Sequence, residues 1–127
     1  MNTMQMQELA ERYVAVWNES NPLARRQRIA ALWTEDGAHY SPTLEAQGHD
    51  DLERRVIMSW DKWVNTARHS FRACADADGH HGGVKFHWEM ITPTGEVSTL
   101  GFEFLQLAPD GRIAAAYMFV EPPKPQR

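Results

Sequence analysis

The stretch Val84-Lys85-Phe86-His87-Trp88-Glu89-Met90 alternates apolar and polar residues, and this alternation decides the fold class. Successive side chains of a β-strand point to opposite faces of its sheet. The four apolar residues of the stretch therefore share one face, and the three polar residues share the other. Such a strand is half-buried, with its apolar face toward a core.

Neighbouring segments have the same period of two. The predicted strands cover residues 69–76, 84–91, 96–107 and 112–120. The separators at 78–83, 92–95 and 109–111 are rich in Gly, Pro and Asp, which favour turns. Because these separators are short, we expect successive strands to pair as an antiparallel meander.

The first half of the chain has a helical period instead. A single apolar stripe marks the first helix and consists of Leu9, Tyr13, and Val16 or Trp17. A second helix is expected to begin at Asn21-Pro22, because asparagine caps free N–H groups and proline suits the first helical position. We expect this helix to end near residues 34–37, where Gly37 can adopt a left-handed conformation.

A short strand over residues 38–41, closed by Pro42, is expected next. Asp50 and Asp51 then open a third helix, since their charges suit a helix N-terminus. Its core face is formed by Leu52, Val56, Trp60 and Trp63. Helices followed by hairpin strands predict an α+β fold, with three N-terminal helices packed on one face of a curved antiparallel sheet. Residues 1–121 are expected to form a single domain, followed by a Pro-rich tail over residues 122–127.

Composition excludes several classes of protein. The chain has 127 residues, of which 43% are hydrophobic and 24% are charged, as in a globular domain. A net charge of −4 argues against nucleic acid as a partner. The lone Cys74 excludes an internal disulfide and a cysteine-based zinc site. The longest apolar run, residues 113–120, is too short for a membrane span, and the first residues contain no signal peptide. We therefore expect a cytoplasmic protein with no membrane partner.

Several stretches resemble one known superfamily. Residues 11–18, ERYVAVWN, are similar to the first helix of ketosteroid isomerase, and residues 32–38, LWTEDGA, to the passage from second helix to first strand. Residues 80–89, HHGGVKFHWE, resemble a hairpin of SnoaL-like proteins, and residues 101–104 with 110–113 resemble their last hairpin. The order of elements resembles the cystatin-like cone of nuclear transport factor 2, and more closely its SnoaL-like branch of polyketide cyclases and ketosteroid isomerase relatives.

The resemblance implies roles for individual residues. Tyr13 matches the tyrosine that donates a hydrogen bond to the developing enolate in ketosteroid isomerases, and Glu103 aligns with their second, protonated donor. Ser41 stands before Pro42, where those enzymes carry the aspartate base. Because an unassisted hydroxyl cannot remove an α-proton at neutral pH, the sequence departs here from isomerisation by the usual base.

The residues themselves support two interpretations of Glu103. In the register of its strand it shares a face with Thr99, Gly101, Leu105 and Leu107. If that face lines a closed cone, desolvation raises the pKa of the carboxyl and lets it act as an acid. If the opposite face does, Glu103 is a solvated or ion-paired surface residue, since Phe102 and Phe104 are apolar as well. Likewise, Tyr13 is either its partner or an ordinary core tyrosine.

Histidine supplies a candidate base. His39 shares the parity of Ser41 in the first strand, so both can face the cavity, and His39 would then replace the missing carboxylate with a pKa near neutrality. The alternative is an outward, solvated His39. His87, on the polar face of its strand, is a weaker candidate, and His80 and His81 lie in a turn.

No metal-ligand spacing, phosphate loop, nucleophile elbow or dinucleotide motif is present, so neither metal nor cofactor is predicted. Ser41 and three of the five tryptophans, Trp17, Trp60 and Trp88, are candidate substrate-binding residues for a flat polycyclic ligand.

Three functions remain compatible with this site. The first is a cofactor-free isomerase, cyclase or dehydratase for a hydrophobic carbonyl compound, with Glu103, Tyr13 and His39 as catalytic residues. The second is a module that binds a small hydrophobic molecule without transforming it, and the third is a protein-association domain. The resemblance also implies a homodimer.

Overall fold

The computed structural model describes residues 1–121, so the predicted Pro-rich tail 122–127 lies outside the described residues. The helices are α1 (Thr3–Asn18), α2 (Pro22–Leu32) and α3 (His49–Ser59), the last of which continues into the π-helix η1 (Trp60–Thr66). The strands are β1 (Trp33–Tyr40), β2 (Glu45–Gln47), β3 (Ser70–Ala73), β4 (Asp78–His80), β5 (Gly83–Ile91), β6 (Val97–Leu107) and β7 (Ile113–Val120).

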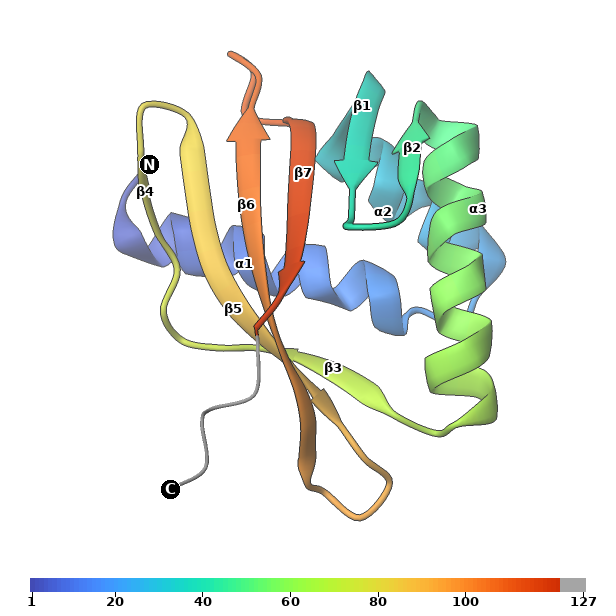
Figure 1. Ribbon diagram of the computed structural model, residues 1–127. Helices are drawn as coiled ribbons and strands as arrows, with labels where there is room; N and C mark the ends of the chain where they lie inside the picture. Colours follow the sequence, from blue (N-terminus) through green and yellow to red (C-terminus); the bar gives the residue numbers. More distant parts are fainter. Residues whose placement is uncertain (122–127) are drawn as a thin grey trace.

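One sheet contains all these strands, in the order β2-β1-β7-β6-β5-β3, with β4 paired to β5. Strands β3, β5, β6 and β7 pair antiparallel as the meander prediction requires, whereas β1 pairs with β7 in parallel. Figure 1 shows α1 crossing one face of the curved sheet, with α2 and α3 beside β1 and β2. The predicted α+β fold, three helices against a curved sheet, is confirmed.

The inner face of β5 is the one that its alternation predicts. Val84, Phe86, Trp88 and Met90 are all buried, while Lys85 is exposed. This face packs in one hydrophobic cluster with α1 and α2. Burial of apolar surface, to which this face contributes, is the dominant favourable term in folding.

Local capping explains where two helices begin. Asn2 and the side chain of Gln5 form a capping box at the start of α1. The Asn21 side chain accepts a hydrogen bond from the backbone N–H of Ala24, with Pro22 at the first position of α2. The predicted start at Asn21-Pro22 is therefore confirmed.

The end of the second helix differs from the prediction. Helix α2 stops at Leu32, and residues 33–37 already belong to β1, where Trp33 pairs with Ile113. Gly37 does not adopt the expected left-handed conformation. Glycine at this position instead leaves room for the fully buried Trp33, because a Cβ on residue 37 would lie 2.7 Å from Cδ1 of that ring. Pairing with β7 thus overrides the helical pattern.

The other differences lie in short segments that depend on their neighbours. Strand β3 covers only part of the predicted 69–76, and β4 occupies the start of a segment predicted as a turn. The three-residue strand β2, which the sequence pattern does not predict, pairs with β1. Such short edge strands form because a partner strand supplies the hydrogen bonds, with little contribution from their own sequence.

Candidate functional site

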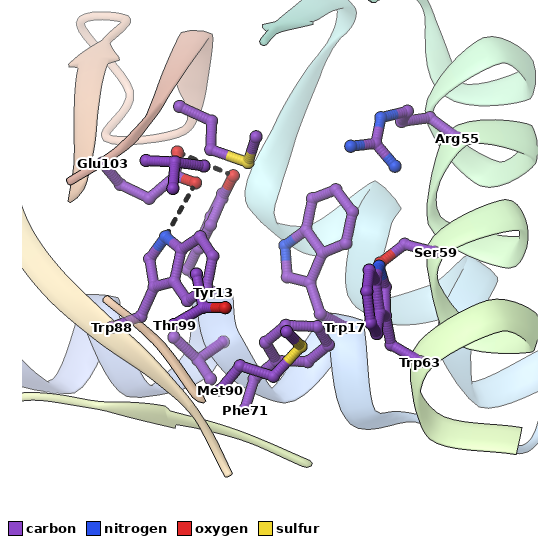
Figure 2. Close-up of a pocket in the computed structure, with 13 residues that line it drawn as sticks. Tyr13, Trp17, Arg55, Ser59, Trp63, Phe71, Trp88, Met90, Thr99 and Glu103 are labelled. Carbon is purple, nitrogen blue, oxygen red and sulfur yellow. Dashed lines mark hydrogen bonds between the residues drawn. The ribbon is translucent and has the colours of Figure 1, made fainter. Parts of the chain in front are cut away.

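A cavity of about 320 Å³ opens between α1, the α3–η1 helix and the inner face of the sheet (Figure 2). Its wall is mainly apolar and aromatic, as is usual for sites that bind small molecules. The lining residues are Tyr13, Val14, Trp17, Arg55, Ser59, Trp63, Phe71, Trp88, Met90, Thr99, Glu103, Met118 and Val120.

Glu103 is the carboxyl in this wall, and it is only 2% exposed. Its Oε2 accepts a hydrogen bond from the Tyr13 hydroxyl at 3.1 Å, and its Oε1 accepts one from the Trp88 indole N–H at 3.2 Å. Figure 2 shows both bonds converging on the carboxyl from α1 and β5. Of the two sequence interpretations, the inward orientation of Glu103 is therefore the one observed.

Burial controls the protonation of this pair. Desolvation raises the pKa of Glu103 well above its usual range, and the hydrogen bonds from Tyr13 and Trp88, with the nearby Arg55, oppose that shift only in part. Burial and the neighbouring Glu103 likewise raise the pKa of Tyr13. The site therefore favours a neutral carboxylic acid beside a neutral phenol.

The tryptophan favours one oxygen of Glu103 as the site of the proton. An indole N–H is a donor only, so Oε1 must act as an acceptor in either protonation state. Because a carbonyl oxygen is the better acceptor, this bond favours the neutral acid with its proton on Oε2, next to the Tyr13 hydroxyl. When Oε2 donates to the Tyr13 oxygen, the hydroxyl hydrogen of Tyr13 is free to point to a ligand.

A glycine makes this arrangement possible. Gly101 lies opposite Trp88 in the β5–β6 pair. A Cβ at Gly101 would stand 2.0 Å from two atoms of the Trp88 indole, so only glycine leaves room for the ring. Glycine at this position thus allows the indole to lie flat against β6 and reach Glu103.

Two polar lining residues, Arg55 and Ser59, were missed by the sequence analysis. They lie on the inner face of α3 at three and seven residues after Leu52, which is the spacing that could have revealed them. The Arg55 guanidinium lies over the ring of Trp17, with Cζ 5.3 Å from the ring centroid. Polar residues on the buried stripe of an amphipathic helix are the signal to look for.

His39 lies deeper than the prediction requires. It is 1% exposed and packs on Trp17 with ring centroids 5.1 Å apart, and it is not among the residues that line the cavity. Both ring nitrogens are buried with no hydrogen-bond partner among the described residues. Burial, aided by the charge of Arg55, lowers the pKa of His39 to about 3. Of the two alternatives the inward orientation is the one observed, and burial keeps the pKa of His39 far below the near-neutral value that a base would need.

Neither Ser41 nor Trp60 lines the cavity. The Ser41 hydroxyl accepts a hydrogen bond from the backbone N–H of Leu44, in the turn that follows β1. Trp60 packs under the guanidinium of Arg25, whose Cζ lies 5.1 Å from the ring centroid. Trp63 lines the cavity in place of Trp60, which the sequence predicted there. The π-helical turn at Trp60 explains this exchange, because its wider winding rotates later residues relative to an α-helical face.

Among the predicted site residues, the structure thus brings four together at the cavity: Tyr13, Trp17, Trp88 and Glu103. Within residues 1–121, no group of three or more His, Cys, Asp or Glu residues is placed to hold a metal ion.

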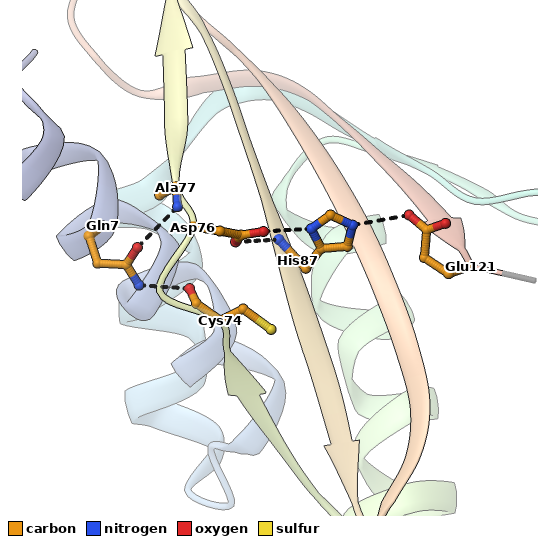
Figure 3. A network of polar contacts seen from close by, with 6 residues as sticks. All are labelled: Gln7, Cys74, Asp76, Ala77, His87 and Glu121. Carbon is orange, nitrogen blue, oxygen red and sulfur yellow. Dashed lines mark hydrogen bonds and ion pairs between the residues drawn. The ribbon is translucent and has the colours of Figure 1, made fainter. Parts of the chain in front are cut away.

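His87 belongs to a different network, on the outer face of the sheet (Figure 3). Its Nδ1 lies 2.6 Å from Oδ2 of Asp76, and its Nε2 lies 3.1 Å from Oε1 of Glu121. The hydrogen bond to Asp76, reinforced by both carboxylate charges, raises the pKa of His87. The imidazole thus connects three segments of chain and takes no part in the cavity.

Comparison with known families identifies the class of protein. A SnoaL-like domain matches residues 10–116, so the chain belongs to the SnoaL-like family. A search of curated proteins gave no match. In the part of the chain that the structure covers, no helix is long and apolar enough to span a membrane.

Solved structures with the same fold include three informative neighbours. A candidate isomerase of the SnoaL-like family from Agrobacterium tumefaciens is 24% identical, with a TM-score of 0.86, covering 94% of this chain and 99% of that one. A candidate polyketide cyclase from Sinorhizobium meliloti is 12% identical, with a TM-score of 0.68 and coverages of 94% and 100%. A protein with a cystatin-like fold from Methylobium petroleophilum is 18% identical, with a TM-score of 0.70 and coverages of 99% and 82%. These similarities confirm the expected cystatin-like fold.

Proposed function

We propose that this SnoaL-like protein binds a hydrophobic carbonyl compound in the cavity and acts on it as a cofactor-free isomerase, cyclase or dehydratase. The observation that carries the proposal is the Glu103 carboxyl, buried in an apolar wall and bonded to Tyr13 and Trp88. A neutral acid in such a place is suited to hydrogen-bond or protonate a substrate oxygen. The structural neighbours described as a candidate isomerase and a candidate polyketide cyclase support the same class of chemistry.

In the proposed mechanism the carbonyl oxygen of the substrate lies near Tyr13 and Glu103. In the structure the Tyr13 hydroxyl donates to Oε2 of Glu103. When the substrate binds, this bond reverses: the protonated Oε2 donates to the Tyr13 oxygen and the Tyr13 hydroxyl donates to the substrate oxygen, so both groups stabilise negative charge as it develops. The aromatic wall excludes water and strengthens these interactions.

Proton transfers are assigned to Glu103 because it is the one carboxyl among the described lining residues. In a dehydration, its proton passes to the departing hydroxyl and the C–O bond breaks with water leaving. The resulting carboxylate then accepts the proton of the adjacent carbon as the C=C bond forms, which restores the acid. His39 has no proton-accepting role in this scheme, because its pKa of about 3 makes it a weak base.

A hydrogen-exchange experiment tests the proposal. The probe is 2-tetralone, a flat bicyclic ketone whose α-hydrogens exchange with D₂O faster when the carbonyl is polarised, and NMR follows the exchange. We expect the protein to accelerate exchange, and Glu103→Gln to reduce that acceleration by about 100-fold or more. Glu89→Gln, on the outer face where Glu89 pairs with Arg72, is the matched control and should change nothing. Equal acceleration by the wild type and Glu103→Gln would refute the role of Glu103.

The second candidate function is ligand binding without chemistry. It is favoured by the position of Ser41, which aligns with the aspartate base of ketosteroid isomerases and lies outside the cavity. In this case 2-tetralone would quench the fluorescence of the lining tryptophans, binding would survive Glu103→Gln, and no exchange would be catalysed. A protein-association role has less support, because the cavity remains open.

A homodimer through the outer face of the sheet is also proposed. Phe104, Tyr117 and Phe119 are exposed there as an aromatic surface on β6 and β7. Light scattering should give twice the monomer mass, and Phe119→Glu should reduce it; a monomeric wild type would contradict this. The cytoplasmic location and the lack of a nucleic-acid partner stay predictions.

A further inference from the structure

Arg55 gives the cavity a second polar pole. It projects from α3, whereas Glu103 projects from β6 on the opposing wall, and Figure 2 shows the two side chains on opposite sides of Trp17. The guanidinium lies over the face of the Trp17 ring, with Cζ 5.3 Å from the ring centroid. A cation–π contact uses the face of the guanidinium, so it does not occupy the N–H groups that lie in the guanidinium plane.

Within residues 1–121, Arg55 has no hydrogen bond or ion pair, and its Nε is buried without a partner. Its neighbour Arg54 pairs with Asp51, and Arg26 pairs with Asp50 across the helices. A buried donor without an acceptor is destabilising. Unlike the unpaired nitrogens of His39 and Trp33, that of Arg55 belongs to a residue that lines the cavity, where a ligand can supply an acceptor. A guanidinium presents a planar fork that matches a carboxylate in a bidentate geometry.

The remaining wall does not neutralise this charge. Among the described lining residues, Glu103 has the one carboxyl group, and its burial favours the neutral acid. The cavity therefore has a positive charge at one pole and an uncharged acid at the other. A ligand with the opposite pattern, an anion at one end and a neutral oxygen at the other, is complementary to it.

Arg55 also borders a shallow hollow on the outside, between β2 and α3, which Glu45, Asp51 and Arg54 help to line. Asp51 pairs with Arg54, and neither carboxylate forms an ion pair with Arg55. The guanidinium therefore stands where the cavity approaches solvent and is half-buried. An ion pair formed there is only partly desolvated, which makes its net free energy more favourable than that of a fully buried pair.

We propose that the cavity is selective for organic anions: its ligand is a flat hydrophobic carbonyl compound that also carries a carboxylate, held by Arg55 at the pole opposite Glu103. The carbonyl half of this inference rests on the proposed function, and the carboxylate half rests on Arg55 alone. Because the two halves involve different residues, they can be tested separately.

The test compares two probes that differ by one ionised carboxyl group, 2-tetralone and 6-carboxy-2-tetralone. Quenching of tryptophan fluorescence measures the Kd of each, since Trp17, Trp63 and Trp88 line the cavity. We expect the wild type to bind the carboxylate at least tenfold more tightly than the ketone. Arg55→Met should weaken carboxylate binding by about 10- to 100-fold, because it removes charged hydrogen bonds, and should leave ketone binding within threefold. Arg55→Lys, which keeps the charge and loses the fork, should give an intermediate value.

Arg54→Met is the matched control, because it removes the same charge from the adjacent residue, whose side chain pairs with Asp51 outside the cavity. It should leave both Kd values unchanged. Circular dichroism establishes whether each variant is folded. If Arg55→Met does not fold, the weaker carboxylate binding expected of Arg55→Lys tests the proposal in its place.

The outcomes separate the two proposals. A wild type without preference for the carboxylate, or a preference that survives Arg55→Met, overturns the anion site while Glu103-dependent exchange can still support the proposed function. A preference that depends on Arg55, together with exchange that is insensitive to Glu103→Gln, supports the anion site and rejects the proposed function. Failure of both probes to bind at millimolar concentration rejects both.

Discussion

Replacing Gly101 by alanine should disrupt the acid site without replacing any of its polar groups. Gly101 lies on β6 opposite Trp88, and a Cβ there would be 2.0 Å from Cε2 and Cζ2 of the indole. Ordinary contact begins near 3.4 Å, so the ring must retreat by about 1.4 Å. Because the ring is buried against Phe71, it cannot make this movement freely.

The magnitude follows from two losses. Overpacking a well-filled core costs about 1–3 kcal/mol. The displaced indole also gives up its hydrogen bond of 3.2 Å to Glu103, which contributes roughly 1 kcal/mol and leaves a buried oxygen without a donor. We therefore expect Gly101→Ala to lower the free energy of unfolding by about 2–4 kcal/mol, a large part of the stability of a domain of this size.

Urea unfolding followed by circular dichroism measures this loss, and a double-mutant cycle assigns it to the indole. Trp88→Leu removes the ring atoms that the new methyl group meets. In that background Gly101→Ala should cost less than about 1 kcal/mol, since alanine itself suits a strand interior better than glycine. An equal cost in both backgrounds, or a cost below about 0.5 kcal/mol in the wild type, would refute a steric clash between the new methyl group and the indole.

Three further predictions concern protonation and capping. The pKa of Glu103 is higher in the folded than in the unfolded protein. The stability that protonated Glu103 contributes is therefore complete below the unfolded pKa of about 4.3. As pH rises from there toward the folded pKa, the free energy of unfolding should fall by up to about 1.4 kcal/mol per pH unit. Urea unfolding between pH 4.5 and 7.5 should show this slope relative to Glu103→Gln, and parallel profiles would contradict it. The raised pKa of His87 should stabilise the fold below about pH 6.5 and cease to do so as pH rises through the folded pKa. His87→Asn should flatten the dependence of Tm on pH from 5 to 8; an unchanged dependence would count against the Asp76–His87–Glu121 network. Asn21→Ala should lower the free energy of unfolding by about 1 kcal/mol through the lost cap on Ala24, whereas Asn21→Asp should retain most of it.

The candidate acid shows how far sequence reasoning reached in the site. Tyr13 and Glu103 are 90 residues apart in the sequence and are joined by a hydrogen bond in the structure. From the sequence, only the family resemblance predicted that they act as a pair. Periodicity alone left two faces open for Glu103, because apolar residues occupy both sides of β6. Pairing with the strongly alternating β5 decides the question, since Phe86 lies opposite Glu103 and is buried.

Arg55 and Trp60 show why other parts of the site could not be predicted from the sequence. A charged residue inside a helix is usually solvent-exposed, so Arg55 gave no signal by itself. The π-helical winding that sends Trp60 to Arg25 and Trp63 to the cavity depends on how the helix meets the sheet. Neither position follows from a regular period of 3.6 residues.

The sequence by itself determined the elements whose patterns are local: the alternation of β5, the turns between the long strands and the cap at Asn21. Each depends on residues a few positions apart, where backbone geometry sets the period. The tertiary structure alone decided the chemistry, because a pKa depends on the water and charge removed by distant segments. The same burial that favours a protonated Glu103 makes His39 a poor base, and both follow from the closure of the helices over the sheet.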